Sequence, residues 1–176
     1  WSKEISMISQ FMKENKTQLK YIIAPHQVNE ENIKKIQAHI PLKTICLSNA
    51  SSESVKACDC LIIDSIGILA AIYKYGDIAF VGGGFYQGIH SILEPATFGL
   101  PVVFGPKYQK FNEAVDLIKA GGAFNVNDDQ QFFSVMNQLL SNENKIKSAG
   151  KISTDYIEKN IGASQTIFDH IQKHFL

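Results

Sequence analysis

The sequence lacks any apolar run of the roughly 18 residues that a membrane-spanning helix needs. Its first residues, WSKEISMISQ, contain no signal-peptide core. Neither charge is in excess, because 17 basic residues balance 17 acidic ones. Sequence-independent nucleic-acid binders usually carry a basic excess, so this class of function is disfavoured. The three cysteines, Cys46, Cys58 and Cys60, form no CxxC pair, which favours reduced thiols of a cytosolic protein over a metal or redox site.

Familiar catalytic and metal-binding motifs are also missing. The sequence contains no GxSxG, HExxH or P-loop pattern. Asp128 and Asp129 are better explained as the start of a helix than as a metal pair. His170 and His174 have the i,i+4 spacing of metal ligands, but they end a terminal helix, where cationic side chains are favoured anyway. We therefore expect no metal site.

The chain length and patterning indicate one α/β domain over residues 1–176. A length of 176 residues suits one domain, and 45% hydrophobic with 19% charged residues excludes a disordered chain. Apolar runs predict strands at 21–25, 44–47, 60–63, 77–81, 101–104 and 123–126. Helical periodicity predicts helices at 2–16, from 29, at 66–73, from 91, and at 110–119, 128–140, 143–159 and 162–175. This alternation predicts a parallel sheet with helices on both faces.

In such sheets, ligands bind beyond the carboxyl ends of the strands, which selects four loops. The richest follows Val81 and reads GGGFYQGIHSILEP. Its glycines allow positive φ and close approach of another group, and Glu94 could accept two hydrogen bonds from a ribose diol. The alternative is a tight turn in which Glu94 only complements the helix dipole. The grouping with His90 favours a ligand site, although the spacing is not the GxGxxG fingerprint.

The other three loops carry weaker signals. His26 could reach a ligand phosphate, or it could be a solvated surface group. Backbone groups around Gly67 could meet a base edge, while Asp64 or Ser65 is expected to cap the following helix. Lys107 or Lys110 could neutralise a phosphate or carboxylate, with a solvated lysine as the alternative.

Taken in order, the segments APH, IIDSIG, DIAFVGGGF, GIHSILEPATFGLPVVFGP and GGAF resemble the C-terminal half of the 3-deoxy-manno-octulosonate (Kdo) transferases. The resemblance implies a GT-B glycosyltransferase with two Rossmann-like halves, of which this chain is the donor-binding one. It further implies CMP-Kdo as donor, a lipid A precursor of lipopolysaccharide assembly as acceptor, inversion at the anomeric carbon, and no metal or other cofactor. The full-length enzyme would act at the cytoplasmic face of the bacterial inner membrane, and the present chain would be soluble.

The resemblance also assigns site residues by position. The nucleotide would be bound by Pro25, His26, Ile66, Gly67, Ile68, Ser91, Ile92, Leu93 and Glu94. The site would be lined by Gly83, Gly84, Gly88, His90 and Lys107. No catalytic residue is expected in this chain, because the general base would belong to the N-terminal acceptor domain. Three positions depart from the family pattern: His26 replaces an arginine, Ser91 an asparagine and Ile68 an acidic residue.

Two alternatives remain at this point. One is another GT-B enzyme that uses a UDP-sugar, either a transferase or an epimerase, and the other is a non-catalytic nucleotide-binding module. Trp1 resembles the end of a turn that follows a strand in the family, so we expect the first strand of the domain to be lacking. Exposed sheet edges would then favour pairing with a second chain.

Overall fold

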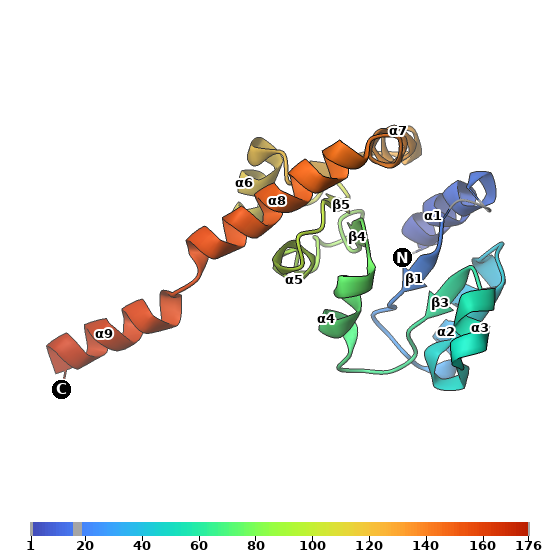
Figure 1. Cartoon of the computed structure of the whole chain (residues 1–176), viewed down its shortest axis with the longest axis horizontal. Helices are drawn as coiled ribbons and strands as arrows, with labels where there is room; N and C mark the ends of the chain where they lie inside the picture. Colours follow the sequence, from blue (N-terminus) through green and yellow to red (C-terminus); the bar gives the residue numbers. More distant parts are fainter. Residues whose placement is uncertain (1, 16–18, 176) are drawn as a thin grey trace.

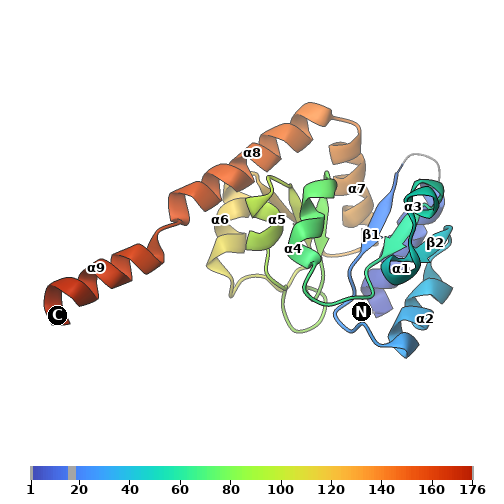
Figure 2. The same cartoon turned by 60° about the horizontal axis from the view of Figure 1, so that its bottom comes forward.

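The computed structural model describes residues 2–15 and 19–175, drawn in Figures 1 and 2; Trp1, and with it the prediction about a preceding turn, lies outside them. Strands and helices alternate along the first part of the chain. In order, the elements are α1 (Ser2–Glu14), β1 (Tyr21–Ile23), α2 (Glu30–His39), β2 (Thr44–Cys46), the 3-10 helix η1 (Leu47–Asn49), α3 (Ser52–Ala57) and β3 (Cys60–Ile62).

The same alternation continues in the second part, which ends in three successive helices. The elements are α4 (Leu69–Ile72), the 3-10 helix η2 (Tyr73–Tyr75), β4 (Ala79–Val81), α5 (Leu93–Thr97), β5 (Val102–Phe104), α6 (Asn112–Ala120), β6 (Ala123–Asn125), α7 (Asp129–Leu140), α8 (Glu143–Asn160) and α9 (Ala163–Phe175). The α/β class is therefore confirmed. Within the described residues, no helix is long and apolar enough to cross a membrane.

The strands form two parallel sheets of three rather than one continuous sheet. The first has the order β1-β3-β2 and the second the order β4-β5-β6. Ile22 pairs with Leu61 in the first sheet, and Phe80 pairs with Val103 in the second. All three residues of β5 are buried, as expected for a strand covered on both faces.

Helix α1 packs against both sheets. Its Ile5 and Met12 belong to the buried cluster of the first sheet, whereas Met7 and Phe11 belong to a cluster with Val103 of the second. Apolar residues at helical spacing therefore point in two directions from one helix. This shared helix therefore connects the buried clusters of the two sheets.

The C-terminal helices differ in how they pack. Helix α8 lies close to the turn after α5, where a Cβ on Gly150 would stand 2.1 Å from the carbonyl oxygen of Gly99, so only glycine fits. Helix α9 extends away from the rest of the molecule (Figure 1), and its Ile167, Phe168 and Ile171 are exposed.

The starts of α7 and α4 show where local sequence patterns were sufficient to predict a helix cap and where they were not. Asp128 caps α7 as predicted, since its side chain accepts a hydrogen bond from the N–H of Gln131. The predicted cap on α4 is wrong: that helix begins at Leu69 with no side-chain cap. Asp64 instead accepts hydrogen bonds from the backbone N–H and the hydroxyl of Ser48. The carboxylate finds its donors on the neighbouring loop because the ends of β2 and β3 lie side by side.

Other boundaries also differ from the predictions. Helix α1 ends at Glu14 instead of residue 16, and α5 begins at Leu93 instead of near Ser91. Helix α3 was not predicted, although Ser51 and Ser54 form a capping box at its start. With only six residues, α3 is too short to show a clear periodicity.

Candidate functional site

The four loops expected to carry the site follow β1, β3, β4 and β5, at the carboxyl ends of parallel strands. Hydrogen bonds, close contacts and one ring stack join three of them. The loop after β3 has a different environment.

The glycine-rich loop after β4 is closed by its own hydrogen bonds. The carbonyl of Gly83 accepts from the N–H groups of Tyr86 and Gly88, and the carbonyl of Gly82 accepts from the N–H of His90. Gly83 has φ of +92°, and a Cβ there would lie 2.4 Å from the carbonyl oxygen of Gly88. The space left by this glycine is therefore filled by the loop itself.

The loops after β4 and β5 are in direct backbone contact. A Cβ on Gly84 would lie 2.7 Å from the backbone of Gly105, and the N–H of Lys107 donates to the carbonyl of Gly84 at 2.9 Å. The Lys107 amine donates to the carbonyl of Tyr86. Lys107, which was expected to line the site, thus ties the two loops together.

Glu4 of α1 is a site residue that the sequence did not suggest. It is 3% exposed, and its carboxylate accepts a hydrogen bond of 2.8 Å from the N–H of Gly83. An acidic residue in the first turn of a helix is ordinary. No local signal connects it with a loop 79 residues further along the chain.

The loops after β1 and β4 meet through two histidines. The rings of His26 and His90 are stacked, with centroids 5.3 Å apart and planes 16° apart. Both side chains are exposed, whereas Pro25 beside His26 is buried. Two predicted site residues that lie far apart in sequence are therefore adjacent in space.

The segment 91–94 presents both exposed and buried side chains. Ser91 and Glu94 are exposed and Leu93 is 38% exposed, but Ile92 is 1% exposed and belongs to the core. The Ile92 side chain therefore belongs to the core and not to the exposed surface of this segment. Burial, and secondarily the charge of Glu94, raise the pKa of Tyr73 to about 12, so Glu94 lies near the 3-10 helix η2.

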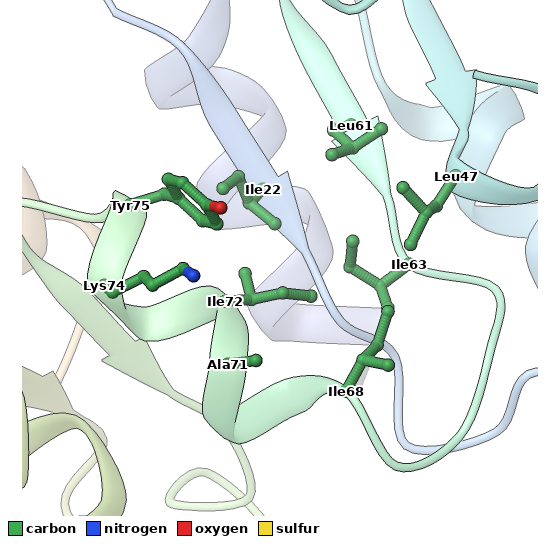
Figure 3. Close-up of a pocket in the computed structure, with 9 residues that line it drawn as sticks. All are labelled: Ile22, Leu47, Leu61, Ile63, Ile68, Ala71, Ile72, Lys74 and Tyr75. Atoms are coloured by element: carbon green, nitrogen blue, oxygen red, sulfur yellow. The ribbon is translucent and has the colours of Figure 1, made fainter. Parts of the chain in front are cut away.

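The loop after β3 combines an open backbone with an apolar side chain. Gly67 has φ of +91° with no atom within 4 Å of its Cβ position, and Ile66 is 85% exposed. Ile68 instead lines an apolar cavity of about 260 Å³ between the first sheet and α4 (Figure 3). Ile22 of β1 points into this cavity towards Tyr75. Of the predicted site residues, Ile68 alone lines it.

Cysteines and metal ligands complete the chemical inventory. All three cysteines are free and buried, and burial raises the pKa of the Cys60 thiol to about 12. Such a thiol stays protonated and unreactive. Residues 2–15 and 19–175 contain no group of three or more His, Cys, Asp or Glu side chains that could hold a metal ion.

Comparison with known proteins gives one consistent result. The chain is 32% identical over 165 residues to the 3-deoxy-D-manno-octulosonic acid transferase of Aquifex aeolicus, which covers 89% of this chain and 45% of that protein. It is 30% identical over 141 residues to the transferase of the same name from Chlamydophila psittaci, covering 78% of this chain and 32% of that protein. The chain thus spans less than half the length of these relatives. No protein-family model matches.

Solved structures agree on the fold. The C-terminal CMP-Kdo binding domain of WaaA from Acinetobacter baumannii superposes with a TM-score of 0.73 at 23% identity, covering 87% of this chain and 80% of that one. The C-terminal domain of the group 1 glycosyl transferase LpcC from Francisella tularensis gives 0.58 at 13% identity, covering 92% and 78%. The sequence relatives and the shared fold together show that this chain belongs to the 3-deoxy-D-manno-octulosonic acid transferase family.

Proposed function

We propose that this chain is the donor-binding domain of a Kdo transferase and that it binds CMP-Kdo. The observation that carries the proposal is the similarity to the Aquifex transferase over 89% of the chain. The fold shared with a CMP-Kdo binding domain supports the choice of donor. The stack of His26 on His90 joins two of the loops at which the nucleotide would bind.

In this proposal the exposed polar groups at the strand ends bind the leaving group. Glu94 accepts hydrogen bonds from the ribose diol, and the Ser91 hydroxyl donates to the phosphate. The open backbone of Gly67 meets the cytosine edge. CMP departs as an anion, so donors fixed around its phosphate stabilise the charge that develops in the transition state.

The remaining parts of the reaction belong to the proposed full-length enzyme. Its N-terminal domain supplies the general base and binds the lipid A precursor at the cytoplasmic face of the inner membrane. Kdo is transferred with inversion and without a metal or other cofactor. This domain would then bind donor but would not catalyse transfer by itself.

Isothermal titration of the protein with CMP and with UMP, each with and without EDTA, tests the proposal. We expect CMP to bind more tightly and EDTA to leave its affinity unchanged. Equal or tighter binding of UMP would contradict CMP-Kdo as the donor and would favour a UDP-sugar instead. Loss of binding in EDTA would contradict the metal-independent site.

A further inference from the structure

The rings of His26 and His90 are stacked although both side chains are exposed. The backbone N–H of His90 is held by the carbonyl of Gly82 at 3.1 Å. Its ring lies against Gly83, where an added Cβ would stand 3.3 Å from Cδ2. His26 follows the buried Pro25 directly. The loops therefore present two parallel imidazoles at the surface.

Charged groups on the neighbouring elements have contacts of their own. Among the cations, the Lys107 amine donates to the Tyr86 carbonyl and Lys3 of α1 lies 4.8 Å from the ring centroid of Phe85. All 17 basic residues of the chain are lysines, so no arginine can serve as a phosphate clamp in this domain.

The acidic side chains at and around these loops also have partners or neighbours of their own. Glu4 accepts from Gly83, Asp64 accepts from Ser48, and Glu94 lies near Tyr73. The two imidazoles are the groups of this set that gain a positive charge and a second N–H donor when they take up a proton.

Two stacked imidazoles respond to an anion in a particular way. Protonating both rings at this distance brings like charges together, which is unfavourable in the free protein. A phosphate bound across their edges attracts each positive charge and accepts hydrogen bonds from their N–H groups. Anion binding must then favour proton uptake, and by linkage the affinity must fall as the pH rises.

We propose that His26 and His90 form a proton-dependent phosphate clamp, in which binding of the donor's phosphate is coupled to uptake of a proton from solvent by the imidazole pair. The inference rests on the proposed nucleotide-donor function and extends it, since it makes donor affinity depend on pH.

Titration calorimetry with the methyl ester of CMP tests this coupling. The ester is a phosphodiester, like the donor, and it lacks the second ionisation near pH 6 of a phosphate monoester. Runs at pH 7 in buffers of different ionisation enthalpy count the protons taken up. We expect about half a proton per site, and an affinity about fivefold weaker at pH 8 than at pH 6.

Three variants complete the test. His26→Ala and His90→Ala should each reduce the proton uptake and flatten the pH dependence, and circular dichroism checks that both remain folded. His39→Ala is the matched control, because His39 is exposed at the end of α2. Its ring forms a hydrogen bond with the carbonyl of Lys35 in the same helix. This variant should behave like the wild-type protein.

The outcomes separate this inference from the function on which it rests. Binding without proton uptake, or uptake that persists in both His26→Ala and His90→Ala, overturns the clamp and leaves nucleotide binding intact. Equal proton uptake together with equal affinity for the methyl ester of UMP supports the clamp while rejecting the preference for cytidine. Absence of binding by either nucleotide ester removes the proposed function and the clamp with it.

Discussion

The carboxylate of Glu4 is buried and accepts a hydrogen bond from the backbone N–H of Gly83 at 2.8 Å. This bond joins the first helix to the glycine-rich loop. One residue earlier in that loop, Gly82 holds the backbone of His90. A residue with no expected role thus supports the geometry of a predicted site residue.

Glu4→Ala should therefore destabilise the protein, because it leaves the Gly83 N–H without its acceptor at a cost of about 1–3 kcal/mol. Glu4→Gln keeps an acceptor oxygen and should cost less. Urea denaturation of both variants measures the difference. Equal losses of unfolding free energy would show that the charge of Glu4, and not its hydrogen bond to the loop, is what stabilises the fold.

Gly83→Ala and Gly67→Ala form a matched pair, since both positions have φ near +90°. Gly67 has open space around its Cβ position, so alanine there should cost only the backbone strain of about 1 kcal/mol. Gly83→Ala adds the contact with Gly88 and should cost about 3 kcal/mol or more. Thermal and urea unfolding measure the loss of unfolding free energy in each variant. Similar losses would mean that the loop relaxes around the new methyl group.

Glu94→Ala should weaken CMP binding about tenfold, because a charged acceptor of the ribose diol is lost. The loss should be smaller with 2′-deoxy-CMP, which offers one hydroxyl fewer. Glu158→Ala on the exposed part of α8 is the control and should leave the affinity unchanged. Calorimetry with both nucleotides measures these losses of affinity. Equal losses for CMP and 2′-deoxy-CMP would exclude a contact between Glu94 and the ribose diol.

The hydrogen bond from the Ser48 hydroxyl, as the main cause, holds the pKa of the Asp64 carboxyl below its usual range. A lowered folded-state pKa contributes stability above the unfolded-state pKa, and that contribution is lost as the pH falls through the folded value. Ser48→Ala should raise the pKa of Asp64, as measured by NMR titration of its carboxyl. The stability gap between wild type and Ser48→Ala should narrow with acidification, and a constant gap would contradict the linkage.

In the part of the chain that the structure describes, strand β1 has a strand partner on one side only. Ile22 at its centre is 39% exposed. A strand edge without a second strand partner favours pairing with another chain, so we expect a concentration-dependent dimer of about twice 19.6 kDa in light scattering. Ile22→Lys should shift it to monomer, whereas Val55→Lys at the similarly exposed surface of α3 should not. A monomer at all concentrations would refute edge pairing.

The fold class and most elements could be predicted from sequence, because alternation of apolar strands with amphipathic helices is a local property. Asp128 was identified as a cap for the same reason, since its partner is three residues away. Asp64 was misassigned because its donors lie on another strand end. The separation into two sheets depended on which strands pair, and pairing is not visible in periodicity.

The sequence by itself determined the α/β class, the four candidate loops and the resemblance that the relatives confirm. Tertiary structure alone decided which groups in those loops meet. In the folded chain, His26 stacks on His90, and the carbonyl oxygen of Gly88 lies where a side chain at Gly83 would stand. Glu4 contacts the same loop from 79 residues away in sequence. The physical reason is that helix and strand patterns arise between near neighbours in the chain. Contacts between loops instead depend on how the strands align at the edge of each sheet and on the helix that packs against both.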